Sequence, residues 1–261
     1  MKKLLCVLLS GILLFALGAC DLDRGSKDNG QDDQEGGTVT IYLTETMTNY
    51  VGNDTKSIEL TYEEGWENKE EFTATYNYKT GNPDAGTTTV TFKNKCTVME
   101  VPGTLRGETR FDDNGRVISQ VQEHLSEYDS IEKTETTYTY DSYGRKLTEE
   151  SKIYYKDREQ PQIQSLTYSY TDTADGSKGV CNSGDTYTLI YDSNYRLISQ
   201  TATNGDVELS SIENTYDDDG RLVSVITYAH GEKMVETCYT YKAVEVSREF
   251  AERFPQFKRE K

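Results

Sequence analysis

A short segment built on aspartate and arginine recurs four times along the chain from residue 111 onward. Each copy opens with an aromatic residue and an aspartate, and an arginine follows the aspartate four positions later. A repeated segment should form the same local structure each time, so it constrains the fold more tightly than any average property does. The copies occupy residues 111–117, 140–147, 191–197 and 216–222.

The pattern predicts a tight β-hairpin with a three-residue loop. In the copy that begins at Tyr216, Asp217 opens a type I turn, its carboxylate can accept backbone N–H bonds, and Gly220 takes the positive φ of a G1 bulge. Arg221 then lies opposite Asp217, and Tyr216 lies opposite Leu222. Each such cross-strand pair contributes about 0.2–1 kcal/mol to stability.

The other copies carry the same turn residues, with two departures. Tyr195 stands where the third copy should have glycine, and a left-handed tyrosine costs about 1–2 kcal/mol. We therefore expect Asn194 to take that conformation in a shifted loop. In the second copy Lys146 occupies the apolar position. We expect the motif glycines to have positive φ. The candidate turn residues are Asp112, Gly115, Arg116, Asp141, Gly144, Arg145, Asp192, Arg196, Asp217, Gly220 and Arg221.

The rest of the chain alternates apolar and polar residues with a period of two, as in Val39, Ile41 and Leu43. No helical pattern is long enough for a βαβ crossover, so the strands must be joined by hairpins. We predict an all-β fold, an antiparallel meander of repeated hairpins that forms a curved open sheet or partly closed barrel. The meander spans 38–245, with motif repeats from about 105 and a degenerate copy over 168–176. A short C-terminal helix with its tail, 246–261, plugs one end.

The first twenty residues predict export. Lys2 and Lys3 precede an apolar run of 14 residues that ends at Leu17, too short to cross a membrane, where about 20 are needed. The segment Leu17-Gly18-Ala19-Cys20 resembles the lipobox of bacterial lipoproteins. The resemblance implies cleavage between Ala19 and Cys20, removal of the signal peptide 1–19, and a diacylglycerol group on Cys20. An ordinary signal peptide cut nearby is the alternative.

Residues 20–37 comprise the candidate lipidated cysteine and a stretch of Asp, Gly, Gln, Asn and Ser in which Leu22 is the only large apolar residue. Such a stretch cannot bury enough apolar surface to offset its ordering, so we expect a flexible acidic tether. Asp21-Leu22-Asp23 is either a surface-export signal or a plain spacer. The expected location is the cell envelope, lipid-anchored to the outer membrane or at the cell surface.

The Tyr-Asp-x-x-Gly-Arg-Leu pattern resembles the YD repeats of RHS-type proteins, and with the lipobox the chain looks like YD-repeat lipoproteins of Gram-negative bacteria. The resemblance covers about residues 105–242, roughly half of the chain. It implies an extended β-meander, because such repeats build a spiralling sheet around a toxin in large RHS proteins. We expect four or five units to be too few to enclose anything.

Charge and residue usage limit which partners, bound groups and membrane structures the chain could have. Without Lys2 and Lys3 the chain has 26 basic and 45 acidic residues, a formal charge of 26 − 45 = −19, which argues against a nucleic-acid partner. Cys96, Cys181 and Cys238 allow at most one disulfide. His124 and His230 have no second ligand at suitable spacing, so we expect no metal and no cofactor. Lys133 and its acidic neighbours put charge on both faces of 131–140, which argues against a transmembrane barrel.

No catalytic motif is present, so we expect no enzyme. The sequence favours a surface-tethered all-β binding or structural lipoprotein that contacts the membrane through its lipid and a glycan or protein through its loops. Trp66, in a charged turn, either stacks on a sugar ring or caps the end of the sheet. The alternatives are a polysaccharide-acting hydrolase and a passive accessory component of an envelope assembly.

Overall fold

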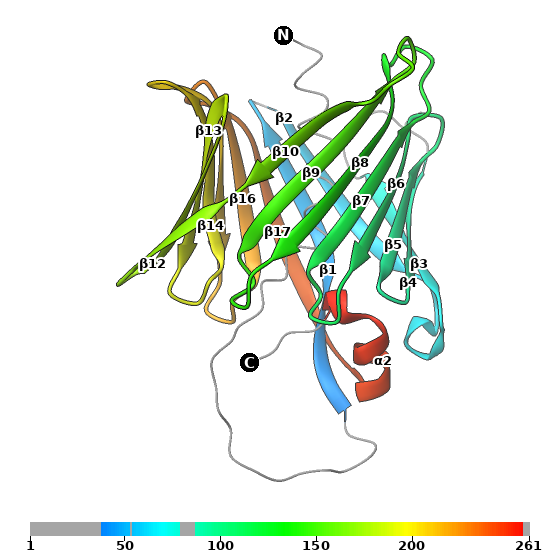
Figure 1. The fold of residues 1–261 in the computed structure, drawn as a ribbon. Coiled ribbons are helices and arrows are strands. Elements are labelled where there is room, and N and C mark those ends of the chain that lie inside the picture. Colours follow the sequence, from blue (N-terminus) through cyan, green and yellow to red (C-terminus); the bar gives the residue numbers. More distant parts are fainter. Residues whose placement is uncertain (1–37, 53, 79–86, 258–261) are drawn as a thin grey trace.

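The computed structural model describes residues 38–52, 54–78 and 87–257 as an antiparallel β-meander with a short C-terminal helix (Figure 1). The predicted signal peptide, Cys20 and the tether lie outside the described residues. The strands are β1 Thr38–Val51, β2 Asp54–Tyr62, β3 Phe72–Tyr78, β4 Thr88–Lys93, β5 Cys96–Val101, β6 Leu105–Phe111, β7 Val117–His124, β8 Ile131–Tyr140, β9 Lys146–Tyr155, β10 Gln162–Thr167, β11 Ser169–Thr173, β12 Gly176–Ser183, β13 Asp185–Asp192, β14 Leu197–Asn204, β15 Val207–Tyr216, β16 Leu222–Ala229 and β17 Glu232–Ser247.

The first and last strands meet, so the sheet curves into a nearly closed barrel. β1 pairs with β2 on one side and with β17 on the other, from Thr38 opposite Ser247 to Tyr50 opposite Glu236. Its pairing with β17 is antiparallel, as in every other ladder of the sheet. A closed antiparallel meander of this kind needs an even number of strands, because each strand reverses the direction of the one before.

The even number arises because β10 and β11 act as one strand. They are separated by Tyr168 alone; β10 pairs with β9, and β11 pairs with β12. Counted as one, they leave 17 − 1 = 16 strands among the described residues. The motif repeats do not close the wall by themselves: β1 to β5, which carry no motif, complete it.

The two faces of the wall differ in composition. The buried faces of β2 to β4 carry Ile58, Phe72, Ala74 and Val90, which belong to the main hydrophobic core. The opposite face is rich in threonine and in charged pairs. Examples are Thr75 opposite Thr89, Thr73 opposite Thr91, and the ion pairs Arg106–Glu123 (3.2 Å) and Lys133–Glu135 (2.7 Å). The outer surface of the barrel is therefore suited to water. The described part of the chain contains no helix with the length and hydrophobicity to cross a bilayer.

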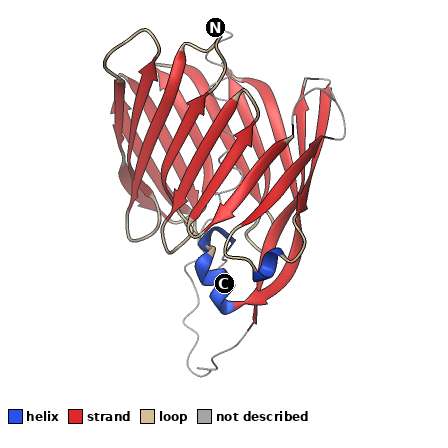
Figure 2. Ribbon diagram, turned by 90° about the vertical axis from the view of Figure 1, so that its right-hand side faces the viewer, coloured by secondary structure: helices blue, strands red, loops and turns tan. Residues whose placement is uncertain are grey.

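The C-terminal helix packs on the core, as the sequence predicted. β17 runs to Ser247, whose side chain caps α2, Arg248–Arg253, by accepting the Phe250 N–H at 3.1 Å. Phe250, Phe254 and Phe257 are buried, the last in the 3-10 turn η2, Pro255–Phe257. Phe72 lies under all three rings, at 6.0, 5.2 and 6.1 Å between centroids. Figure 2 shows the helical turns gathered at one end of the barrel.

All described elements thus lie within residues 38–257, and a chain that begins at residue 21 retains the whole barrel.

Replacing Phe254 with alanine should lower the free energy of unfolding by about 3–5 kcal/mol, because its fully buried ring would leave a cavity in the core. Urea denaturation of the chain from residue 21 would measure this. Tyr128→Ala is the control, since Tyr128 is 96% exposed and should change stability little. Equal effects of the two substitutions would contradict this account of the C-terminal plug.

Candidate functional site

All four motif hairpins lie along one end of the barrel, which we call the motif rim and define by residues 112–116, 141–145, 192–196 and 217–221. The strand pairing shows the predicted bulge at each loop, with Tyr216 opposite Leu222 in the last copy. Gly115, Gly144 and Gly220 have φ of 77°, 85° and 75°. Their predicted positive φ is confirmed.

The motif aspartate holds each loop together through both carboxylate oxygens. Asp112 Oδ1 accepts the N–H groups of Asn114 and Arg116, both at 2.9 Å, and Oδ2 accepts Arg116 Nε at 2.7 Å. The loops opened by Asp141 and Asp192 repeat all three of these bonds. In the last loop, Asp217 accepts the backbone N–H and the Nε–H of Arg221 in the same way. These carboxylates are therefore engaged within their own loops.

The expectation that Asn194 takes the left-handed position was wrong. Tyr195 itself has φ of 60°, and its N–H donates to Asp192 O at 3.0 Å, as the motif glycines do in the other copies. The ring of Tyr195 stacks on that of Tyr143 with 4.8 Å between centroids. Such a pair contributes about 0.5–1.5 kcal/mol, which offsets much of the left-handed strain of about 1–2 kcal/mol.

Gly115 is needed for a second reason besides its φ. A Cβ at this position would lie 2.5 Å from the carbonyl oxygen of Pro255, in η2. The first motif loop therefore packs directly on the C-terminal plug, and only glycine allows that approach.

The motif arginines also stack on aromatic rings of neighbouring segments. Arg116 lies over the Tyr140 ring at 5.2 Å, and Arg196 lies over the Tyr216 ring at 5.0 Å. The ring below the last arginine belongs to β1, where Tyr42 lies 4.8 Å from Arg221. Each guanidinium therefore links its own loop to the next segment around the rim.

Tyrosine hydroxyls complete these links. The hydroxyls of two motif tyrosines, Tyr140 and Tyr216, and of Tyr241, which lies 25 residues after Tyr216, each donate to the carbonyl of the residue that follows the arginine of the preceding motif hairpin. The bonds are Tyr140 to Val117 (2.7 Å), Tyr216 to Leu197 (3.1 Å) and Tyr241 to Leu222 (2.6 Å). Sequence reasoning placed the tyrosines but missed this bond. The 25-residue spacing of Tyr216 and Tyr241 was the signal that could have revealed it.

The degenerate copy predicted over 168–176 does not form a motif loop. Thr173 pairs with Gly176, so β11 and β12 are joined by a two-residue turn. Tyr170 nevertheless takes the role of the motif tyrosine: its hydroxyl donates to Lys146 O at 2.5 Å, and its ring lies 4.5 Å from Arg145.

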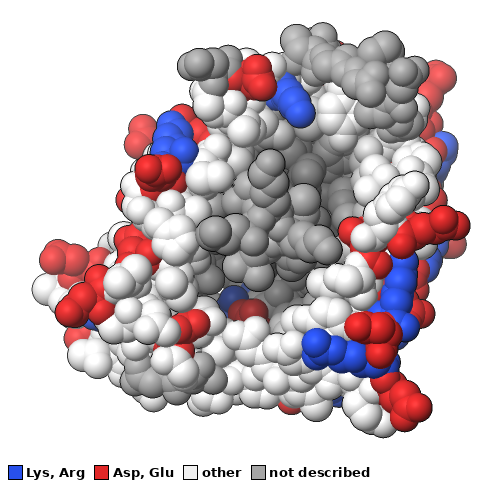
Figure 3. All heavy atoms as spheres, turned by 90° about the horizontal axis from the view of Figure 1, so that it is seen from above, with Lys and Arg blue, Asp and Glu red and all other residues white. Residues whose placement is uncertain are grey.

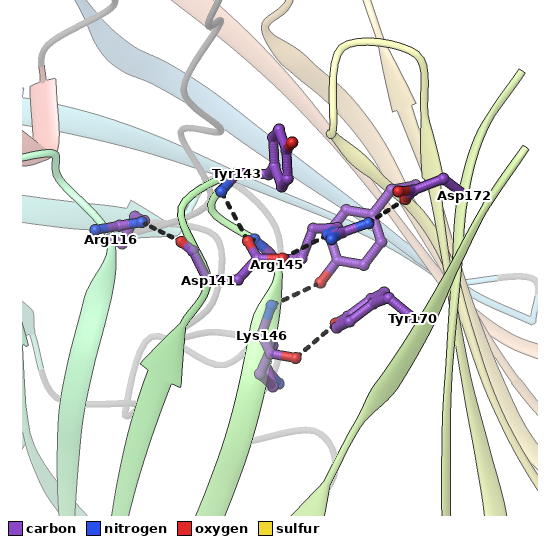
Figure 4. A network of polar contacts seen from close by, with 8 residues as sticks. Arg116, Asp141, Tyr143, Arg145, Lys146, Tyr170 and Asp172 are labelled. Carbon is purple, nitrogen blue, oxygen red and sulfur yellow. Dashed lines mark hydrogen bonds and ion pairs between the residues drawn. The ribbon is translucent and has the colours of Figure 1, made fainter. Parts of the chain in front are cut away.

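Arg145 is the most enclosed motif arginine, with 8% of its side chain exposed (Figure 4). Its Nε donates to Asp141 at 2.6 Å, and its NH1 group contacts Asp172 of β11. The rings of Tyr143 and Tyr170 flank it at 5.0 and 4.5 Å. This cluster connects the motif loop that precedes β9 to β11. It lies near Tyr168, where the continuous β10–β11 strand changes its partner from β9 to β12.

Trp66 does not stand free in a loop. It begins the 3-10 turn η1, Trp66–Asn68, is half-buried, and lies 5.3 Å from the rings of both Phe72 and Phe250. These contacts fit the alternative in which it caps the end of the sheet. A ligand contact at Trp66 stays a prediction.

Metal ligands and cysteine thiols were the other candidate groups in the described residues. They include no group of three or more acidic, histidine or cysteine side chains placed to hold a metal ion. The cysteines Cys96, Cys181 and Cys238 are free thiols.

Tyrosines also line the inner side of the barrel. Tyr76 and Tyr168 are buried, and their hydroxyls have no hydrogen-bond partner among the described residues. Burial raises the pKa of these two phenols above the ordinary value of 10. Burial likewise raises the pKa of other tyrosines, namely Tyr62, Tyr138, Tyr170 and Tyr239.

The opposite rim exposes apolar side chains. Tyr128, in the β7–β8 loop, is 96% exposed, and Leu125 beside it is 51% exposed. Figure 3 views this rim, with charged side chains spread around its outside. We call the exposed apolar residues at or beside its turns the apolar crown: Tyr50, Val51, Tyr78, Leu125, Tyr128, Ile163 and Val207. Sequence reasoning missed them, because single apolar residues in polar turns carry no periodic signal.

Comparisons with known proteins find similarity in structure. No protein-family profile matches the chain, and no curated protein matches it. A crystal structure of a porin-like protein from Bacteroides uniformis matches with a TM-score of 0.41 and 10% sequence identity. The match covers 78% of this chain and 97% of that protein.

The buried tyrosines should make the fold sensitive to alkali. Their pKa is raised in the folded state, so above pH of about 10 the unfolded chain releases protons that the folded chain keeps. Stability is thus fully present below pH 10 and falls as the pH rises further. Urea midpoints at pH 8, 9.5 and 11, with absorbance at 295 nm reporting phenolate, would measure this. Nearly complete ionisation of all tyrosines at pH 11 without unfolding would contradict their burial.

Proposed function

We propose that this chain is a lipid-anchored protein of the cell envelope that holds its barrel at a membrane surface and binds a glycan or protein through the apolar crown. The supporting observation is the direction of β1. It starts at Thr38 on the motif-rim side and ends at Tyr50 and Val51 in the crown. A tether that precedes Thr38 therefore leaves from the motif rim, and the crown lies at the far end of the barrel.

The dimensions agree with this orientation. A flexible tether of 17 residues between the lipidated cysteine and β1 has a root-mean-square length of about 20–25 Å. A ten-residue strand such as β8 spans about 34 Å, so the crown would lie well away from the membrane. The threonine-rich and charged outer wall suits a barrel that stands in water rather than in lipid.

The chemistry of the crown suits recognition. Exposed tyrosines offer an apolar ring face that stacks on sugars and also anchors protein interfaces. Tyr50, Tyr78 and Tyr128 are 41%, 41% and 96% exposed. The motif aspartates, by contrast, are held by their own arginines. They are poorly placed to act as the acids of a hydrolase, which stays an alternative together with a passive accessory role.

Binding is tested with the chain that begins at residue 21, on a glycan array and in a pull-down from envelope extracts. A ligand found in either assay should bind Tyr128→Ala at least about fivefold more weakly, as expected when a hot-spot residue is removed. Tyr143→Ala is the matched control, because Tyr143 is an exposed tyrosine on the motif rim, 46% exposed. Absence of any ligand in both assays would contradict the binding role.

The anchor is tested in a bacterial host with labelled palmitate. The full chain should incorporate the label and remain with membranes, whereas Cys20→Ser should lose the label and become soluble, because the thioether has no sulfur to form on. Cys6→Ser, inside the signal peptide, should keep the label. An unlabelled parent chain would favour the ordinary signal peptide instead.

A further inference from the structure

One strand of the barrel wall has a free edge. β10 pairs with β9 only, from Gln162 opposite Ile153 to Thr167 opposite Thr148. The Tyr168 N–H donates to Leu147 O at 2.9 Å, so even-numbered residues of β10 direct their backbone groups toward β9. The N–H and C=O groups of Ile163 and Ser165 therefore point the other way, toward β12.

β12 does not pair with this edge. Its ladder with β11 ends where Ser169 lies opposite Val180, and beyond this point β12 pairs only with β13. The last backbone contact across the gap is the Thr167 N–H, which donates to Cys181 Sγ at 3.3 Å. Beyond it a side chain crosses, as Gln164 Nε2 donates to the Tyr187 hydroxyl of β13 at 3.3 Å. Figure 1 shows β10 and β12 diverging from there. Within the described residues, the backbone groups of Ile163 and Ser165 on this side have no partner.

The sequence of this edge does not guard it against pairing. Edge strands in natural proteins usually carry charges or a proline that block the approach of another strand. Residues 160–171 contain no charged residue, although 28% of the whole chain is charged. The single proline of this segment, Pro161, precedes the strand. Ile163 is 59% exposed.

We propose that this edge pairs with the same edge of a second copy of the chain, in a symmetric antiparallel dimer. A two-fold axis at Gln164 places Ile163 of each copy opposite Ser165 of the other. This register uses all the free groups and gives four hydrogen bonds, two for each Ile163–Ser165 pair.

Charge favours this place for contact between identical molecules. Each copy has a formal charge of −17, so two copies repel each other over most of their surface. The neutral segment 160–171 removes that repulsion at the edge. On β9, Lys152 lies opposite Ile163 and Glu150 opposite Ser165. The two-fold axis therefore aligns Lys152 of one copy with Glu150 of the other, and like charges are not brought into the same row.

Cysteine cross-linking tests the register with the chain from residue 21. In an antiparallel sheet a non-hydrogen-bonded pair has Cα atoms about 4.5 Å apart, within the disulfide range of about 4.4–6.8 Å. Gln164→Cys should therefore give disulfide dimers under mild oxidation. Gln162→Cys is the matched control, because its two copies would lie roughly 14 Å apart. The unchanged chain measures the background from its own cysteines. Equal cross-linking by the two variants would overturn the register.

The oligomeric state tests the pairing itself. Light scattering over a range of concentrations should show a dimer of the chain from residue 21. Ser165→Pro removes an N–H that faces the gap and leaves the β9 ladder intact, so dimerisation should weaken at least about tenfold. Ser165→Ala keeps the backbone donor and should dimerise like the parent. A parent chain that stays monomeric throughout, or equal dimerisation of the proline and alanine variants, would overturn the proposal. Neither outcome depends on the anchor, and of the crown residues only Ile163 lies at this edge.

Discussion

The barrel depends on the contact between the motif arginine and two different partners. In each motif loop the guanidinium binds the aspartate that opens the loop, and in all four copies it also lies over a tyrosine ring of the neighbouring segment. A loop with the aspartate alone would be a stable turn with no link to its neighbour. Because planar arginine can stack and donate in its plane at once, local turns are joined into a continuous rim, a role that lysine could not fill.

Closure of the barrel requires that β10 and β11 count as one strand. The long strand made of β10 and β11 leaves β9 at Tyr168 and continues beside β12. If β10 and β11 ran in opposite directions as two separate strands, the number of strands would be odd, and β17 would meet β1 in the wrong direction. The cluster around Arg145 and Asp172 lies beside this change of partner, so the most enclosed motif arginine holds the segment where β11 leaves β9.

The hairpin register could be predicted from the sequence, because Asp217, Gly220 and Arg221 have conformational preferences that act within a few residues. The C-terminal plug was equally predictable, since Phe250 and Phe254 lie one turn apart before Pro255. Closure was not predictable, because it depends on pairing between β1 and β17, which lie about two hundred residues apart. Tyr195 misled local reasoning for the same reason: its strain is offset by Tyr143, a residue of another hairpin. The crown could not be predicted, because exposed residues leave no periodic pattern.

The pairing of β1 with β17 also determines how the barrel responds to a mechanical load. Twelve residue pairs join these strands, and β1 pairs with β2 along its second half. A pull on the chain before Thr38 that is resisted at the crown acts along the axis of β1. The hydrogen bonds on both sides of β1 are then loaded together in shear rather than broken one after another. The strand that receives the load first is therefore the one that is held by two ladders.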